Sequence, residues 1–315
     1  MRYDILSKMK HRIIFSIIIF AVLLGVVFLC VTRIPQKENE TDKINVVASF
    51  YPLAHIATVV GGEFVLVRDL VPSGTEPHDF EPSPRILAEL GRSDLFLYNG
   101  AGFEPWVPKW EQSTRARPMR VINMADTLKG AGVSFIEEGG AVNPHFWLDP
   151  MIFTEEVKIV RDALVAIDPA HEDAFRENAE RFISALGNLD QHFREGLSSC
   201  ALRDIIVLHE AFGYLARRYD FSATAIVGIS PEEEPSPKEL VRIITLAREK
   251  GVKHIFSETI ASPKFSEAVA REIGGSTLVL NPIESMTPSG VQSKQDYIFA
   301  MEMNLNNLRN AMICN

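Results

Sequence analysis

The sequence predicts an α/β protein of two lobes, each with a parallel β-sheet flanked by helices, joined by one long connecting helix. Strand-like and helix-like runs alternate along residues 44–150 and again after residue 199, and a helical pattern lies between them. The chain has 315 residues, 46% of them hydrophobic and 23% charged, which is enough for two lobes with sizeable cores. We assign residues 44–168 to the N-terminal lobe, 169–198 to the connecting helix and 199–315 to the C-terminal lobe.

The N-terminus predicts export. Four basic residues between Arg2 and Arg12 precede an uncharged apolar run from Ile13 to Thr32, a pattern typical of a signal peptide or an N-terminal membrane anchor. We assign residues 1–33 to this leader and 34–43, which are polar and lack apolar periodicity, to a tether. The remainder is therefore expected to be extracytoplasmic, either anchored to the outer face of the cytoplasmic membrane or periplasmic.

The charge of the chain argues against polyanionic partners. The net charge is −9, and because residues 1–33 carry five basic and one acidic side chain, the exported part carries −13. Such a surface disfavours nucleic acid and anionic membrane, so we expect no nucleic-acid partner.

Two cysteines lie beyond the leader, Cys200 and Cys314. They are too few for a zinc ribbon, and an exported compartment permits a disulfide between them. A free Cys314 in a closing helix is the alternative.

The first lobe is predicted from alternating signals. Its strands are Ile44–Phe50, Glu63–Val71, Leu95–Tyr98 and Arg120–Met124. One helix starts at Pro52 and ends at Gly61-Gly62, and another has Ser83 as N-cap and Pro84 at its first position. Such alternation indicates a parallel sheet, because each crossover helix returns the chain to the same end of the sheet.

The connecting helix and the second lobe follow. Residues 170–197 place apolar side chains three and four residues apart, and a helix of about 28 residues would be about 40 Å long. The second lobe repeats the alternation, with strands at Asp204–Leu208, Phe221–Val227, Lys253–Phe256 and Ser276–Leu280, and a last helix from Asp296.

Three histidines lie where an extended run meets a helix or turn. They are His78, His145 and His209, 67 and 64 residues apart, and Asn281 follows the last strand after 72 more. Open α/β sheets bind ligands outside the carboxyl ends of their strands. We therefore expect these four residues to converge in the cleft between the lobes.

Four segments carry a family resemblance. They are Gly-x-x-Pro-His-x-Phe-Glu-Pro-Ser at 74–83, Pro-His-x-Trp-Leu-Asp-Pro at 144–150, His-x-Ala-Phe-Gly-Tyr at 209–214 and Phe-x-Glu-x-x-x-Ser-Pro-Lys at 256–264. From Ile44 onward the chain resembles the metal-binding solute-binding lipoproteins of ABC importers for zinc and manganese. The resemblance implies a monomeric, membrane-tethered receptor that delivers one divalent metal ion to an ABC transporter permease, with the metal site in the inter-lobe cleft.

The resemblance also suggests a lipid on Cys30. Signal processing prefers a small residue before that cysteine, and this chain has Leu29. An uncleaved transmembrane anchor therefore stands beside lipidation as an interpretation.

The ligand types favour zinc. Neutral imidazoles suit Zn²⁺, whereas Mn²⁺ prefers carboxylate oxygens, so Zn²⁺ is expected, with Mn²⁺ or Fe²⁺ as alternatives. Members of the family that this chain resembles usually carry Asp at the fourth ligand position, where this chain has Asn281. We expect His78, His145 and His209 as ligands with Asn281 at or near the fourth place. Glu258 is the main alternative, and Glu284, Glu76 or a water could also complete a tetrahedron.

Metal-bound histidines also need partners that orient their rings. Asp149 and Glu210 are the carboxylates that we expect in this role.

Two other function classes compete. Three histidines with an open position would suit a zinc enzyme, with Glu210 as general base. However, no second histidine follows His209 four residues later, and no nucleophile accompanies the cluster. An adhesin would need no chelating geometry. We expect a receptor that is not an enzyme.

Overall fold

The computed structural model describes residues 43–315 apart from 114–118, 139 and 294. The predicted leader, Cys30 and all of the predicted tether except Lys43 lie outside the described residues. Among the residues that are described, no helix is long and apolar enough to cross a membrane.

Two four-stranded parallel sheets form the framework, which confirms the predicted fold class. The first has the order β2-β1-β3-β4 and the second the order β10-β9-β7-β8. The first sheet consists of β1 (Ile44–Ala48), β2 (Val65–Asp69), β3 (Leu95–Tyr98) and β4 (Arg120–Asn123). The second consists of β7 (Asp204–Val207), β8 (Ser222–Ala225), β9 (His254–Ser257) and β10 (Ser276–Val279), and a short antiparallel hairpin joins β5 (Glu137–Glu138) to β6 (Ala141–Val142).

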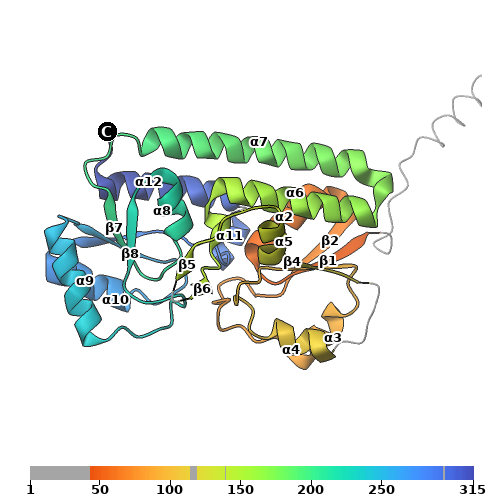
Figure 1. The fold of residues 1–315 in the computed structure, drawn as a ribbon, viewed down its shortest axis with the longest axis horizontal. Helices are drawn as coiled ribbons and strands as arrows, with labels where there is room; N and C mark the ends of the chain where they lie inside the picture. Colours follow the sequence, from red (N-terminus) through yellow and green to blue (C-terminus); the bar gives the residue numbers. More distant parts are fainter. Residues whose placement is uncertain (1–42, 114–118, 139, 294) are drawn as a thin grey trace, which may run out of the picture. The chain divides into compact units, whose positions relative to one another are not determined.

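Helices connect the strands (Figure 1). Those up to residue 167 are α2 (Tyr51–Gly61), α3 (Pro84–Leu90), α4 (Val107–Ser113), α5 (Met124–Gly130) and α6 (Pro150–Ile167), with 3-10 turns η2 (Gly62–Phe64) and η3 (Phe146–Leu148). Those that follow are η4 (Pro169–His171), α7 (Glu172–Gly196), α8 (Gly213–Tyr219), α9 (Pro237–Glu249), α10 (Lys264–Ile273), α11 (Pro288–Gln292) and α12 (Tyr297–Met312).

Local sequence signals explain several helix starts. The Ser83 hydroxyl accepts a hydrogen bond from the Ile86 N–H, and Pro84 occupies the first helical position, as predicted. At the start of α6, the Asp149 carboxylate accepts from the N–H groups of Met151 and Ile152. These caps satisfy backbone donors that have no partner within the helix.

The long helix α7 spans both lobes. It begins two residues later than predicted, because Pro169–His171 forms a 3-10 turn first. One face buries Phe175, Phe182 and Leu189 against neighbouring helices. Figure 1 shows α7 running alongside α6 and reaching α12, so one rigid rod contacts helices of both sheets.

The two lobes share apolar packing. A single buried cluster contains Phe50 and Trp147 from the first lobe together with Tyr214 and Phe256 from the second. The Trp147 ring packs edge-on against Phe50 with 4.8 Å between centroids. A shared core of this kind opposes wide hinge opening between the lobes.

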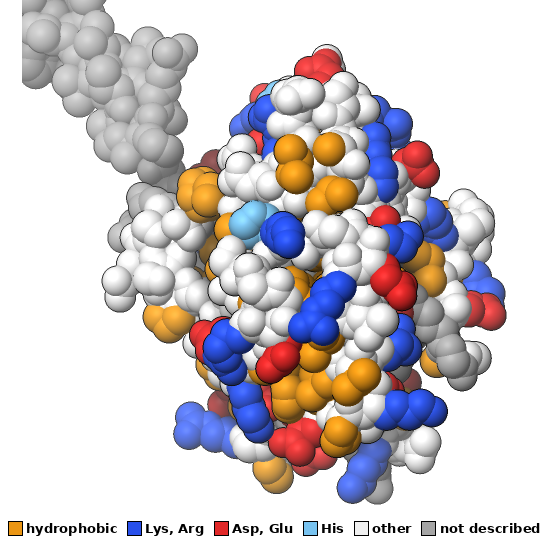
Figure 2. All heavy atoms as spheres, turned by 90° about the vertical axis from the view of Figure 1, so that its left-hand side faces the viewer, with side chains coloured by type: hydrophobic (Ala, Val, Ile, Leu, Met, Phe, Trp, Pro, Cys, Tyr) orange, Lys and Arg blue, Asp and Glu red, His pale blue; other side chains and the backbone are white. Residues whose placement is uncertain are grey.

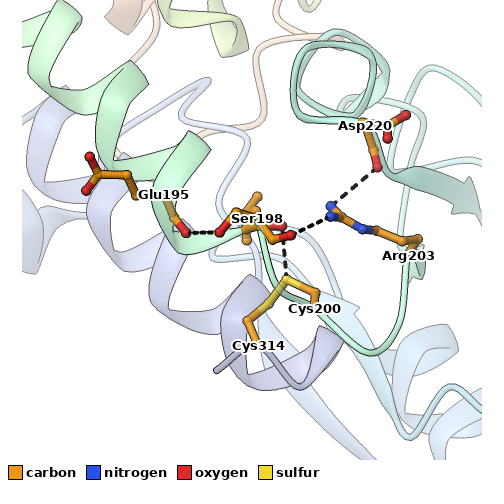
Figure 3. Close-up of a disulfide and its surroundings, with 7 residues drawn as sticks. Glu195, Ser198, Cys200, Arg203, Asp220 and Cys314 are labelled. Atoms are coloured by element: carbon orange, nitrogen blue, oxygen red, sulfur yellow. Dashed lines mark hydrogen bonds between the residues drawn. A yellow bond between two sulfur atoms is a disulfide. The ribbon is translucent and has the colours of Figure 1, made fainter.

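A disulfide closes the end of the C-terminal lobe. It joins Cys200, just after α7, to Cys314, just after α12 (Figure 3). The backbones pair beside it, since the N–H of Leu202 donates to the carbonyl of Met312 at 3.0 Å. Of the two interpretations left open by the sequence, the structure therefore has the bridge.

The surface beside the second sheet carries side chains of both charges. Figure 2 shows the side of the molecule on which α9 and α10 lie, with basic and acidic side chains interspersed.

Candidate metal centre

His78 lies in the loop between β2 and α3, and this loop is tied to the other lobe. The Gly74 N–H donates to the carbonyl of Met286 at 2.9 Å and contacts the Ser285 hydroxyl at 3.3 Å. The His78 N–H donates to the Glu76 carboxylate at 3.1 Å. Its ring packs edge-on against Phe103. The loop therefore holds the imidazole between segments of both lobes.

His145 is fully buried just before η3. Asn143, two residues earlier, directs its side-chain oxygen at both the His145 N–H (3.0 Å) and Nδ1 (2.9 Å). An amide oxygen only accepts, so this contact places the ring proton on Nδ1. The Nε2 lone pair is thereby left for a cation.

His209 directly follows Leu208 at the end of β7 and is also fully buried. Its Nδ1 donates to the Glu258 carboxylate at 2.6 Å, and Glu258 follows β9, the neighbouring strand. A carboxylate behind an imidazole fixes the ring orientation and makes the other nitrogen a stronger donor to metal.

Glu284 brings the fourth donor atom. Its Oε1 lies 3.0 Å from His145 Nε2, 3.2 Å from His209 Nε2 and 3.5 Å from His78 Nε2. The Nε2 atom of His145 lies 3.2 Å from those of both His78 and His209. All four donor atoms lie within 4.8 Å of one another, and three of the four residues are buried.

Five of the six separations between the donor atoms are close to the edge length of a zinc tetrahedron. Zn–N and Zn–O bonds of about 2.0–2.1 Å at tetrahedral angles place neighbouring ligand atoms about 3.3 Å apart. These five separations range from 3.0 to 3.5 Å, and the sixth, between the Nε2 atoms of His78 and His209, is at most 4.8 Å. The four donor atoms are therefore close enough together to surround one cation.

The electrostatics of the cluster suit a cation. Burial lowers the pKa of His145 to about 3. Burial would also lower the pKa of His209, but the carboxylates of Glu258 and Glu284 raise it well above its usual value. Burial alone would raise the pKa of the Glu284 carboxyl, yet the surrounding histidines, His209 foremost, hold it well below its usual range. At neutral pH the ion-free cluster thus combines the Glu284 carboxylate, a neutral His145 and a protonated His209, so a metal ion that binds His209 must displace its Nε2 proton.

The structure gives the other predicted candidates different surroundings. The Asn281 side-chain oxygen accepts from the Ile283 N–H at 2.8 Å and from the Thr259 hydroxyl at 3.2 Å. Glu258 lies behind His209 rather than at its Nε2. The Glu76 carboxylate accepts from the backbone of His78, and burial, followed by the nearby Glu284 charge, raises its pKa to about 7.

The two carboxylates expected to orient the imidazoles have other contacts. Asp149 caps α6 and lies 3.2 Å from the Arg218 guanidinium. Glu210 follows His209, and its backbone carbonyl accepts from the Asn143 side chain at 2.7 Å. The Nδ1 atoms of His145 and His209 contact Asn143 and Glu258 respectively. A polar residue two positions before His145 was the available signal for Asn143.

A comparison with protein-family models identifies the family of this chain. The model for the zinc-uptake complex component A, periplasmic, matches residues 46–311. The chain belongs to this family. The resemblance drawn from the four motifs is thereby confirmed.

Relatives within the family are named for zinc. The high-affinity zinc uptake system protein ZnuA of Bacillus subtilis is 33% identical over 288 residues, covering 88% of this chain and 90% of that protein. The zinc-binding lipoprotein AdcA of Streptococcus pneumoniae is 32% identical over 87% of this chain, which spans 56% of its length.

Solved structures agree with the fold. The Zn(II)-bound ZnuA-like domain of Streptococcus pneumoniae AdcA superposes with a TM-score of 0.75 at 32% identity, covering 86% of this chain and 99% of that domain. The laminin-binding protein Lmb of Streptococcus agalactiae, described as bifunctional with adhesin and metal-transporting activity, has a TM-score of 0.76 at 29% identity, covering 86% and 99%.

Proposed function

We propose that this protein is the extracytoplasmic zinc receptor of an ABC importer, and that it binds one Zn²⁺ through His78, His145, His209 and Glu284. The observation that carries the proposal is the convergence of four donor atoms within 4.8 Å of one another, five of their six separations being 3.0–3.5 Å. Membership of the zinc-uptake family supports the same conclusion. The predicted role of Asn281 passes to Glu284, because the Asn281 side-chain oxygen is engaged with the backbone of Ile283.

Zinc is favoured over manganese and iron by the donor set. Three imidazoles and one carboxylate suit a borderline cation, whereas Mn²⁺ favours more oxygen ligands and higher coordination. The Asn143 and Glu258 contacts support the choice, because they engage Nδ1 of two imidazoles and turn Nε2 of each toward the other donor atoms.

A receptor fits this site better than an enzyme does. Catalytic zinc sites keep a coordination position open for water or substrate, whereas structural sites are closed by four protein ligands. Four protein donors in a mostly buried cluster correspond to the closed type. The chain belongs to the family of the zinc-uptake complex component A, and we propose that it binds zinc without turnover.

The N-terminal leader would hold the receptor at the outer face of the cytoplasmic membrane as a monomer, beside the permease that takes the ion. Its apolar run supports a membrane anchor, cleaved and lipidated at Cys30 or uncleaved. Loss of growth under zinc limitation on deletion of the protein, restored by the intact chain and not by His145→Ala, would support delivery to a permease.

Metal titration tests the site directly. We expect the purified apo chain to bind one Zn²⁺ per molecule more tightly than Mn²⁺ in competition with a chelator. His145→Ala should weaken zinc binding at least about a hundredfold, because it removes a ligand from the centre of the cluster. His192→Ala, in an exposed pair with Glu302, is the matched control and should bind like wild type. Tighter manganese binding, or unchanged affinity in His145→Ala, would overturn the proposal.

A further inference from the structure

A short segment, residues 280–283, connects the end of β10 to Glu284 in the metal site. The strand ends at Val279, and the buried Leu280 still pairs with the second sheet through its N–H, which donates to the Ser257 carbonyl at 2.9 Å. Asn281, Pro282 and Ile283 then lead to Glu284. The chain must therefore turn sharply within three residues to place Glu284 at the three histidines.

That turn rests on a strained residue. Ile283 has a φ of +60°, a conformation that is unfavourable for a β-branched side chain. Such conformations persist only where the surroundings over-determine them. Here the Ile283 side chain is fully buried, and the carbonyl of the preceding Pro282 accepts from Trp147 Nε1 at 2.8 Å.

The Asn281 side chain supplies the local constraint. Its oxygen accepts from the N–H of Ile283, two residues later, which is the pattern of an Asx turn. The Thr259 hydroxyl donates to the same oxygen and orients the amide. The hydrogen bond compensates for part of the cost of the Ile283 conformation.

Asn304 holds Asn281 from the other side. It lies in α12 with 1% of its surface exposed. Its side-chain oxygen accepts from the Asn281 N–H at 2.8 Å, and its side-chain nitrogen donates to the Asn281 carbonyl at 2.7 Å. One amide thus pairs with both backbone groups of Asn281, as an adjacent strand would. The turn is thereby fastened to α12.

We infer that Asn281 and Asn304 are positioning residues that hold the Glu284 carboxylate in the metal site. This inference rests on the proposed function, since it takes Glu284 to be a ligand. Asn281 then acts without touching the ion. It stabilises the backbone conformation at Ile283 that brings the Glu284 carboxylate to the Nε2 atoms of the three histidines.

A double-mutant cycle tests this coupling in the full chain. Asn281→Ala should weaken binding of Zn²⁺ about 10- to 100-fold, the range for partners that orient metal ligands. In a Glu284→Ala background the same substitution should change affinity by less than about twofold, because its effect passes through Glu284. Asn307→Ala is the matched control: Asn307 also lies in α12 and donates to a backbone carbonyl, that of Val279, but outside the turn. It should bind zinc like wild type.

The outcomes separate the two proposals. An equal loss in both backgrounds would overturn the positioning role while leaving Glu284 as a ligand. Unchanged zinc affinity in Glu284→Ala alone would overturn the proposed ligand set and this inference with it. Asn281→Ser supplies a hydroxyl oxygen that can accept from the Ile283 N–H. It is measured in both backgrounds as a second variant, so that the coupling can still be determined if Asn281→Ala folds poorly.

A spectroscopic readout distinguishes positioning from stability. With Co²⁺ in place of Zn²⁺, the visible absorption reports the coordination geometry. We expect the Asn281→Ala spectrum to move toward that of Glu284→Ala, and the Asn307→Ala spectrum to match wild type. An Asn281→Ala spectrum identical to wild type would overturn the inference.

Discussion

At the scale of single residues, the site is built from pairs rather than from isolated ligands. His145 has Asn143 at its Nδ1, and His209 has Glu258 at its Nδ1. Each partner determines which ring nitrogen carries the proton and therefore which nitrogen faces the ion. The chemistry of the centre depends on these partners as well as on the four donor atoms.

The Glu258–His209 pair gives the first prediction. Glu258→Gln keeps a hydrogen-bond acceptor but removes the charge behind the imidazole, so zinc affinity should fall about tenfold. The measurement is competition with a chromogenic chelator at neutral pH. Glu302→Gln is the control, because Glu302 forms the same kind of pair with His192 at 2.7 Å on the exposed side of α12. Equal affinities for the two variants would refute a role for Glu258 at the site.

At the scale of elements, α2 contains a half-buried histidine outside the site. The His55 ring stacks on Tyr51 at 5.6 Å and meets Phe182 of α7 edge-on at 5.4 Å, and among the described residues its buried Nε2 has no hydrogen-bond partner. Burial lowers the pKa of His55 to about 4, although the charge of Asp296 acts in the opposite direction. The folded chain therefore favours the neutral form of this ring.

A pH-dependent loss of stability follows from that packing. As the pH falls from 6.5 to 4, the unfolded chain takes up a proton at His55 and the folded chain does not, so unfolding becomes easier by about 3 kcal/mol. Below pH 4 this contribution stays constant. His55→Gln should remove it, so the difference in unfolding free energy between wild type and variant should change across this interval in urea titrations. The difference isolates His55 from partly buried carboxyls such as Asp69, whose raised pKa has the opposite effect. A constant difference would contradict the assignment.

Elements were predictable where a local signal decided them. The strands of both sheets and the long helix follow from apolar patterning, and α3 follows from Ser83 and Pro84. The position of Glu284 was not predictable in this way. It depends on the backbone of Ile283 and on Asn304, which is 23 residues beyond Asn281 in another element. The sequence pattern therefore predicts Asn281, at the end of the strand, as the fourth ligand. In the structure, the tertiary contacts of the turn bring Glu284, three residues later, to the histidines instead.

At the scale of the whole molecule, the bridge joins Cys200 to Cys314, which are 114 positions apart in the sequence. The second sheet lies within the loop that this bridge closes. Removing such a long cross-link increases the freedom of the unfolded chain, which should cost about 4–5 kcal/mol of stability. The test is guanidinium unfolding of the double variant Cys200→Ser, Cys314→Ser, which avoids a free thiol. A reductant should destabilise wild type to the same level and leave the variant unchanged. Equal midpoints for oxidised wild type and variant would contradict this expectation.

Zinc should stabilise both lobes at once, because its ligands come from both and because the lobes share one buried cluster. A ligand that binds only the folded state adds about 4 kcal/mol at a thousandfold excess over its dissociation constant. We therefore expect zinc to shift thermal unfolding upward as a single transition, with far-ultraviolet circular dichroism and tryptophan fluorescence changing together. The fluorescence signal includes that of Trp147, whose Nε1 donates a hydrogen bond to the carbonyl of Pro282 in the turn before Glu284. His145→Ala should show no zinc-dependent shift. If zinc stabilised one lobe and left the other unfolding at its apo temperature, the shared cluster would not couple the lobes, and the ion would be held by one lobe alone.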